Sequence, residues 1–274
     1  MVNRPFQKTI KHLNFLFRKF DKECLKRRRK VTFEVLFHHK FLQITKHLGV
    51  IPANHLFRRI SKIDVSPQAI HQFNDKVPLR YLQKINMDIL KDRFAGKNNR
   101  IFAVDGTRLS LNRKIAILNS SYKLTPKEGY TDALLTTIFE VNQKTPFRWN
   151  LTPHHNERRG FLDLLPSLKR GDTVIFDRGY YSEQLLKELD ARKVKFIFRL
   201  KSNSLIARLP GTDIPVPRPK TTPLRKVSYS LKGTTFTLLT NLGVQWDVRQ
   251  LADLYHSRWQ IEEWYNFVDQ IFNL

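Results

Sequence analysis

The sequence predicts a basic helical N-terminal domain followed by an α/β domain. In the first hundred residues, apolar side chains recur at the three- and four-residue spacing of helices. From residue 101 onward, short β-rich apolar runs alternate with helical stretches, which is typical of an α/β domain. The polar segment 95–100 separates the two patterns. We therefore expect one domain at residues 1–96 and a second at residues 97–274.

The charge of the chain predicts a polyanionic partner. Its 274 residues include 49 Lys and Arg against 24 Asp and Glu, a formal net charge of +25. Such an excess destabilises a compact chain unless a polyanion neutralises it, and duplex DNA carries a phosphate charge about every 1.7 Å of its axis. With 41% hydrophobic residues the chain can build a packed core, which excludes a disordered basic tail.

Several classes of protein are excluded by what the sequence lacks. No run approaches the length of about 18 apolar residues that a membrane helix needs, and the N-terminus has no signal-peptide apolar block. We therefore expect a soluble cytoplasmic protein with no membrane contact. Cys24 is the only cysteine, so a disulfide framework or a cysteine zinc site is excluded. Any metal must be held by histidine or carboxylate side chains.

The N-terminal domain begins with a basic amphipathic helix. The first fifty residues hold 13 Lys and Arg against three acidic residues, and Leu13, Leu16, Phe17 and Phe20 recur at helical spacing. The basic run that follows contains Arg27, Arg28 and Arg29. We interpret this run as a footprint for phosphate groups, with a solvated face as the alternative.

Further helices complete this domain. Residues 53–77 predict two short helices around a break at 64–67, with Ser66 as N-cap and Pro67 at the first helical position. A helix-turn-helix fits this pattern, although two structural helices fit it better. Residues 81–94 form one apolar stripe and predict a longer helix.

The second domain alternates strands and helices. We expect strands at residues 101–104, 134–141, 173–176, 196–200 and 235–240. The expected helices lie at 161–169, 182–193 and 248–271. Five of the thirteen prolines fall between residues 209 and 224 and exclude a central strand or helix there. An extended, β-rich insertion is therefore expected at about residues 203–240.

Two aspartates follow predicted buried strands. Asp105 comes directly after residues 101–104, and Asp177 directly after 173–176. Ligands commonly bind at the ends of strands in open α/β sheets. A strand-ending turn is the alternative for Asp105, because Asp-Gly favours turns. Asp177 is followed by Arg178, Gly179 and Tyr180, which a simple turn explains less well.

A third group of polar residues lies in the expected last helix. At about 100° per residue, Arg258 falls within about 60° and Glu262 within about 20° of Tyr255, so the three share one face. The alternative is a surface ion pair between Arg258 and Glu262, worth a few tenths of a kcal/mol. His154 and His155, with Glu157 nearby, are better explained as loop residues than as a zinc site, because no second ligand pair has metal spacing.

Taken together, these blocks resemble the signatures of a known family. Asp105-Gly106-Thr107, Asp177-Arg178-Gly179-Tyr180 and Tyr255-x2-Arg258-x3-Glu262 look like the three blocks of the DDE transposases of the insertion sequence 4 family. The resemblance extends over about residues 101–262. It implies a ribonuclease H-like core, with the β-rich insertion between the second and third acidic residues.

The resemblance implies metal-dependent chemistry on DNA. Asp105, Asp177 and Glu262 would be the catalytic residues and the ligands of Mg²⁺, for which Mn²⁺ can substitute. Two such ions, about 3.5–4 Å apart, stabilise the attacking and leaving oxygens of a phosphodiester. The family's reaction is cleavage of a strand at the end of the element, followed by attack of the freed 3′-hydroxyl on further phosphodiesters.

The resemblance also implies a set of DNA contacts. Tyr255 and Arg258 would hold phosphates near the scissile bond, and Arg178 and Lys201 are further candidates. The partner is double-stranded DNA, both transposon ends and target, in the bacterial nucleoid. Whether two copies of the chain form a homodimer in the DNA complex stays open.

Two departures from the family pattern bear on activity. Asp269 stands seven residues after Glu262, where the family has a lysine, and the chain ends at Leu274, where family members usually continue. A repelling charge thus replaces one that attracts phosphate, and a weakly active or truncated copy is expected. The alternatives are a DNA-binding remnant that cannot cut and a stand-alone nuclease of the same fold.

Overall fold

A computed structural model describes residues 4–24, 31–46, 48–74, 87, 90, 94, 96–111, 121, 131–217 and 223–272. The chain divides into two compact units. One contains Met1–Gly96 with Gln270–Asn273, and the other contains Lys97–Asp269 with Leu274.

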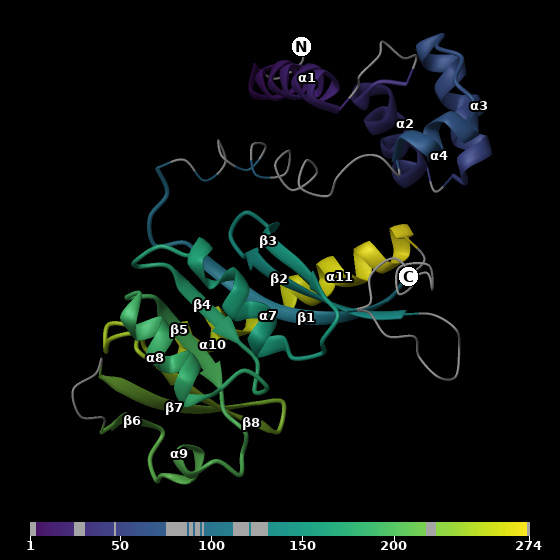
Figure 1. The fold of residues 1–274 in the computed structure, drawn as a ribbon. Coiled ribbons are helices and arrows are strands. Elements are labelled where there is room, and N and C mark those ends of the chain that lie inside the picture. Colours follow the sequence, from purple (N-terminus) through teal and green to yellow (C-terminus); the bar gives the residue numbers. More distant parts are fainter. Residues whose placement is uncertain are drawn as a thin grey trace. The chain divides into compact units, whose positions relative to one another are not determined.

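The N-terminal unit is built from helices (Figure 1). These are α1 (Arg4–Cys24), α2 (Phe33–Thr45), α3 (Val50–Ser61) and α4 (Pro67–Asn74). The apolar stripe expected on the first helix is the buried one, since Leu16, Phe17 and Phe20 are all less than 5% exposed. Phe33 of α2 packs against two of these rings, with centroid distances of 5.8 Å to Phe17 and 5.4 Å to Phe20.

The two short helices expected in residues 53–77 are present as α3 and α4. Lys62 adopts a left-handed conformation with φ of 60° and ends α3. Ser66 caps α4, because its hydroxyl accepts a 3.1 Å hydrogen bond from the Ala69 amide. The helix expected at residues 81–94 and the basic run with Arg27, Arg28 and Arg29 lie largely or wholly outside the described residues.

The second unit contains a mixed eight-stranded sheet in the order β3-β2-β1-β4-β5-β8-β7-β6 (Figure 1). β1 pairs with β4 and β4 with β5 in parallel, and the other neighbours are antiparallel. The strands are β1 (Ile101–Leu111), β2 (Thr131–Glu140), β3 (Thr145–Thr152), β4 (Thr173–Phe176), β5 (Lys195–Arg199), β6 (Asp213–Val216), β7 (Leu224–Leu231) and β8 (Thr234–Thr240).

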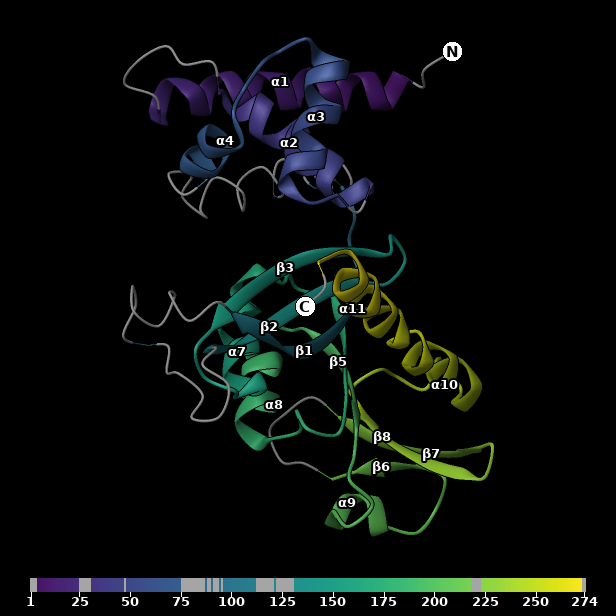
Figure 2. The same ribbon diagram turned by 90° about the vertical axis from the view of Figure 1, so that its right-hand side faces the viewer.

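Helices cover both faces of this sheet, as Figures 1 and 2 show. α7 (Glu157–Leu164) and α8 (Glu183–Ala191) lie on one face, and α10 (Val248–His256) and α11 (Trp259–Phe272) on the other. A short 3-10 helix, Leu165–Ser167, follows α7, and α9 (Leu205–Arg208) follows β5. No helix in the described ranges is long and apolar enough to cross a membrane.

Successive side chains of a strand point to opposite faces of the sheet, and this determines which helices each side chain contacts. The rings of Phe176 and Phe198 stack at 4.5 Å, and Phe161 of α7 contacts Phe176 at 5.0 Å. Ile175 and Ile197 belong instead to the core cluster that contains residues of α10. Because side chains alternate with a period of two, a residue that follows Phe176 lies on the α10 side.

The structure differs from the expected strands at β1 and at β3. β1 continues through Asp105 to Leu111, so Asp105 lies inside a strand and not at its end. The reason is that β1 leaves β4 after Val104 but stays paired with β2 as far as Leu111. β3 was not expected at all, because five of its eight residues are only half-buried and its sequence has no clean apolar alternation.

The expected helix at 248–271 is two helices. α10 ends at His256 and α11 begins at Trp259. At the junction the Arg258 amide bonds the Tyr255 carbonyl and the Ile261 amide bonds the Arg258 carbonyl, which are three-residue and not four-residue steps. The helical hydrogen bonding therefore tightens at Arg258, which separates α10 from α11.

The strands of the expected insertion, β6 to β8, extend the same sheet. β8 pairs with β5 through Ile197–Arg199, so the insertion region continues the hydrogen bonding of the core strands. Pro215 lies in β6, which is the edge strand. This placement follows from the missing amide hydrogen of proline, which excludes it from central strands.

A buried ion pair joins the starts of β1 and β4. Arg100 Nη2 lies 2.6 Å from Asp172 Oδ2, and both side chains are less than 5% exposed. The same carboxylate oxygen accepts a 2.8 Å hydrogen bond from the Lys169 amide. The Arg100 carbonyl accepts from the Thr173 amide at 2.8 Å, so backbone and side chains both fix the parallel register.

Replacing Asp172 should therefore destabilise the second unit. In Asp172→Ala the buried Arg100 guanidinium loses its carboxylate partner, which should cost about 3–5 kcal/mol in the free energy of unfolding. Asp163→Ala, at an exposed position of α7, is the control and should change it by less than about 0.5 kcal/mol. Urea unfolding followed by circular dichroism measures both, and equal effects would contradict the prediction.

Candidate active site

The parallel register brings the two predicted aspartates side by side. Val104 of β1 pairs with Phe176 of β4, and the next residue of each chain is Asp105 or Asp177. β5 continues the row, because Phe198 pairs with Phe176 and is followed by Arg199. Asp105, Asp177 and Arg199 each follow a buried apolar residue of their own strand. Because side chains alternate along a strand, all three lie on the face covered by α10 and α11.

The junction of α10 and α11 faces these aspartates. Tyr255 donates a 3.2 Å hydrogen bond to Asp177 Oδ1. Arg258 Nη1 lies 3.5 Å from Asp105 Oδ2, and its Nη2 is hydrogen-bonded to Glu262 Oε1. The structure thus brings all five residues of this predicted group together. Arg258 is only 7% exposed, so its pairing is not the solvated surface ion pair that was the alternative.

Burial makes this group electrostatically unusual. It raises the pKa of Asp105 to about 6, since the opposing effect of Arg258 is smaller and the charges of Glu157 and Glu262 add to the rise. Burial also raises the pKa of Tyr255, to which the charge of Asp177 contributes. For Arg258, burial lowers the pKa but the surrounding acidic groups outweigh it, so the guanidinium stays charged.

Two residues that position this group were missed by sequence reasoning. Tyr265 of α11 is buried and donates a 2.9 Å hydrogen bond to the backbone carbonyl of Asp105. Its spacing of three residues from Glu262 was a usable signal, because that spacing keeps both on one helix face. Arg199 pairs with Asp177 at 3.8 Å, and it follows an apolar strand just as the two aspartates do.

Glu157 is a further missed residue. It is the first residue of α7, and a Cβ atom on Gly106 would lie 2.9 Å from its Cγ. Gly106 was expected to favour a turn, but it lies within β1, where its missing side chain makes room for Glu157. Burial raises the pKa of Glu157, with a further contribution from the charge of Asp177.

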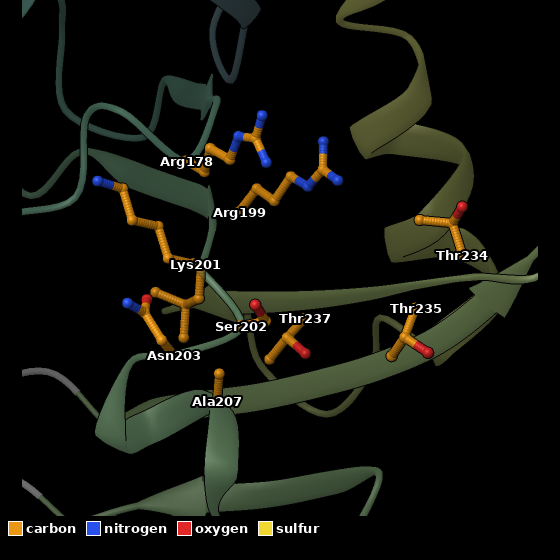
Figure 3. Close-up of a pocket in the computed structure, with 10 residues that line it drawn as sticks. Arg178, Arg199, Lys201, Ser202, Asn203, Ala207, Thr234, Thr235 and Thr237 are labelled. Atoms are coloured by element: carbon orange, nitrogen blue, oxygen red, sulfur yellow. The ribbon is translucent and has the colours of Figure 1, made fainter.

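A basic cavity of about 840 Å³ is lined by Arg178, the chain neighbour of Asp177, and by Arg199, its ion-pair partner (Figure 3). Its charged lining consists of Arg178, Arg199 and Lys201, and its described lining includes no acidic residue. Hydroxyl and amide groups complete the polar wall, from Ser202, Asn203, Thr234, Thr235 and Thr237. The Arg199 guanidinium lies 4.6 Å from the ring of Phe236, which restricts it. Such a cavity suits an anionic ligand.

Some predicted residues lie outside what can be described. Arg27, Arg28 and Arg29 fall in an undescribed segment, and the side chain of Asp269 is likewise outside the described part of α11. Within the described ranges, no three His, Cys, Asp or Glu side chains are gathered closely enough to hold a metal ion. Arg258 lies between Asp105 and Glu262 and pairs with both.

The raised pKa of Asp105 predicts a pH-dependent cost to stability. Its carboxyl has a pKa of about 6 in the fold against 3.8 as the ordinary value, so ionisation destabilises the folded state. Above pH 6, Asp105→Asn should therefore stabilise the protein, by up to about 3 kcal/mol. The gain should shrink as the pH falls below 6 and disappear below about 3.8, where the carboxyl is mostly protonated in both the folded and the unfolded state. Thermal unfolding at several pH values in EDTA measures this, and a pH-independent difference would contradict it.

Comparison with known proteins identifies the family. The family model described as "Transposase DDE domain" matches residues 96–274. The chain is also similar to the transposase for insertion sequence element IS231C of Bacillus thuringiensis subsp. berliner, with 24% identity over 155 residues. That match covers 52% of this chain and 32% of the IS231C protein, so the chain spans well under two thirds of that relative's length.

The fold is similar to that of a solved transposase. The cryo-EM structure of a piggyBac transposase synaptic complex with hairpin DNA has a TM-score of 0.52 and 12% sequence identity. The likeness covers 94% of this chain and 64% of that chain. At this identity it shows the fold alone, a mixed α/β structure of the ribonuclease H-like type. Because the family match takes in more than half of the residues, the chain belongs to the Transposase DDE domain family.

Proposed function

We propose that this DNA transposase cleaves strands at the ends of an insertion-sequence element and transfers them, as in the insertion sequence 4 family. The observation that carries the proposal is the convergence of Asp105 and Asp177, on adjacent parallel strands, with Tyr255, Arg258 and Glu262. The two aspartates come from one sheet and the other three residues from the α10–α11 junction. A mere surface ion pair would not require this convergence.

The proposed cofactor is Mg²⁺, or Mn²⁺ in its place. The donor set fits, because carboxylate oxygens are what hard divalent cations prefer, and Asp105, Asp177 and Glu262 are 21%, 32% and 43% exposed. When bound, the metal activates water and stabilises charge on the reacting oxygens. In the described arrangement the three carboxylates are too far apart to hold one ion, so they would have to move together around it as Arg258 turns toward a DNA phosphate.

Arg258 has a defined part in this proposal. In the described state it offsets the charge of Asp105 and Glu262, which limits their mutual repulsion. Its planar guanidinium can donate two parallel hydrogen bonds to a phosphate as readily as to a carboxylate. Tyr255 orients Asp177 through its hydroxyl, and the same hydroxyl can contact a phosphate of the DNA backbone.

DNA binding is proposed for the basic cavity and for the N-terminal unit. Arg178 and Lys201 would contact phosphates that lead to Asp177, and Arg27, Arg28 and Arg29 would contribute non-specific affinity. The partners are transposon ends and target DNA in the bacterial nucleoid, and a homodimer in the DNA complex belongs to the same proposal. A remnant that binds without cutting is less well supported, because the acidic residues and Arg258 are assembled.

Asp177→Asn should abolish cleavage while it leaves DNA binding nearly intact. The amide removes a metal ligand but no phosphate contact, so the two activities should separate. Supercoiled DNA that carries the element ends, incubated with Mg²⁺, measures nicking, and a mobility shift measures binding. Asp163→Asn, at an exposed position of α7, is the control and should cleave like the wild type. Full cleavage by Asp177→Asn would overturn the assignment.

Lys201→Gln should weaken DNA binding in a salt-dependent way. Each lost phosphate contact should lower the log–log slope of affinity against salt by about 0.9. The matched control is Lys187→Gln, which is exposed on α8 and does not line the basic cavity. Fluorescence anisotropy with duplex DNA at several salt concentrations measures both slopes. Equal slopes for the two variants would remove the basic cavity from the DNA interface.

A further inference from the structure

Arg199 belongs both to the candidate active site and to the basic cavity. Its Nη1 atom lies 3.8 Å from Asp177 Oδ1, and its side chain lines the cavity together with Arg178 and Lys201 (Figure 3). The side chain is 25% exposed, so part of it is accessible to a ligand in the cavity. A ligand that contacts Arg199 from the cavity would therefore contact the partner of Asp177.

Two side chains from different elements hold the same oxygen of Asp177. Tyr255 of α10 donates a 3.2 Å hydrogen bond to Oδ1, and Arg199 of β5 approaches that atom as well. Contacts from two directions restrict the plane of the carboxylate, and with it the position of Oδ2. The geometry of Asp177 therefore depends on where Arg199 and Tyr255 lie.

The aromatic ring of Phe236 contacts both of these side chains. The guanidinium carbon of Arg199 lies 4.6 Å from the centroid of this ring, within the range of a cation–π interaction. The Tyr255 ring lies 6.0 Å from it, centroid to centroid. The register of the sheet explains the contact with Arg199. Arg199 pairs with Leu238 of β8, and Phe236 lies two residues before Leu238, on the same face of the strand.

The position of Phe236 is itself fixed by aromatic neighbours. Its ring stacks on that of Tyr229 of β7, with 5.3 Å between the centroids and an interplanar angle of 6°. It packs at 75° to the His256 ring, with a centroid distance of 5.1 Å. Tyr229 Oη and His256 Nε2 are joined by a 3.2 Å hydrogen bond. The ring that contacts Arg199 is therefore held between β7 and the end of α10.

The chemistry of a guanidinium group allows Arg199 to contact a carboxylate and a further anion at once. It carries five N–H donors in a rigid plane, and an ion pair with one carboxylate leaves other donors available. The described wall of the basic cavity contains cations, hydroxyls and amides but no acidic side chain, so a phosphate group suits these donors. Lysine would supply the charge without the fixed geometry.

We propose that Arg199 is a positioning residue that binds a DNA phosphate in the basic cavity and orients Asp177 at the same time, and that Phe236 holds it in place. The inference rests on the proposed function and adds a connection between DNA binding and the carboxylate. Phe236 belongs to β8, so the insertion would contribute to chemistry that takes place outside it. A DNA strand in the cavity would thus fix the geometry of Asp177.

Substitutions of Arg199 separate its charge from its geometry. Arg199→Lys should keep the wild-type slope of log affinity against log salt for duplex DNA, because the charge remains, but slow Mg²⁺-dependent cleavage by about 10- to 100-fold. Arg199→Gln should slow cleavage similarly and lower the slope by about 0.9. The control is Arg192→Lys, at an exposed position after α8 that does not line the cavity, and it should match the wild type in both measurements.

The results that would overturn the proposal differ between these variants. Wild-type cleavage by a folded Arg199→Lys variant would show that Arg199 does not position Asp177. An unchanged salt slope in Arg199→Gln would show that Arg199 does not bind a phosphate. If the wild type cuts DNA and the Arg199 variants cut equally well, the proposed function stands and this inference fails. If the wild type does not cut DNA, both fail.

Phe236→Leu tests the link between Arg199 and the ring. It should slow cleavage by about 10-fold at saturating DNA and leave the salt slope unchanged, because no charge is lost. Phe236→Tyr keeps the ring and should retain most of the cleavage that Phe236→Leu loses. In the double variant with Arg199→Lys, cleavage should exceed the product of the two separate losses, and fully multiplicative losses would overturn the link. If Phe236→Leu does not fold, Phe236→Tyr combined with Arg199→Lys decides in the same way.

Discussion

Arg258 provides the positive charge that allows acidic side chains to lie together in the second unit. It pairs with Asp105 at 3.5 Å and with Glu262, and it is almost fully buried. Two like charges about 4 Å apart repel by roughly 4 kcal/mol near a protein surface, so a cluster of carboxylates needs such a cation. The pKa of Asp105 is nevertheless raised, mainly because the carboxyl is buried, and the charge of Arg258 only partly offsets that effect. The site therefore has a stability cost that a metal ion would relieve.

The packing of the second unit positions Arg258 next to Asp105 and Glu262. Ile261 and Tyr265, which follow the junction between α10 and α11, pack with residues of β1 and β2 in one apolar cluster. Tyr265 also bonds the backbone of Asp105, which ties the helix to the strand that carries the acid. On the opposite face, α7 brings Glu157 to the same place through two close glycine contacts.

Sequence patterns predicted the elements that local physics determines. The strand at 173–176, the Ser66 cap and the apolar stripe of α1 follow from short-range rules, and the structure contains all three. The extension of β1 beyond Asp105 depends on pairing with β2, which is distant in sequence. Glu157 was interpreted as a loop residue, together with His154 and His155, for a similar reason. Its position depends on the space left by Gly106 of β1, which is distant in sequence.

The edge strand β6 has a consequence for how this molecule associates with others. It has only four residues, includes Pro215, and forms the outer limit of the eight-stranded sheet. A short edge that lacks an amide hydrogen is a poor template for a foreign strand. At this edge the sheet therefore disfavours pairing with a strand of another molecule. This limits both β-augmentation and edge-to-edge aggregation.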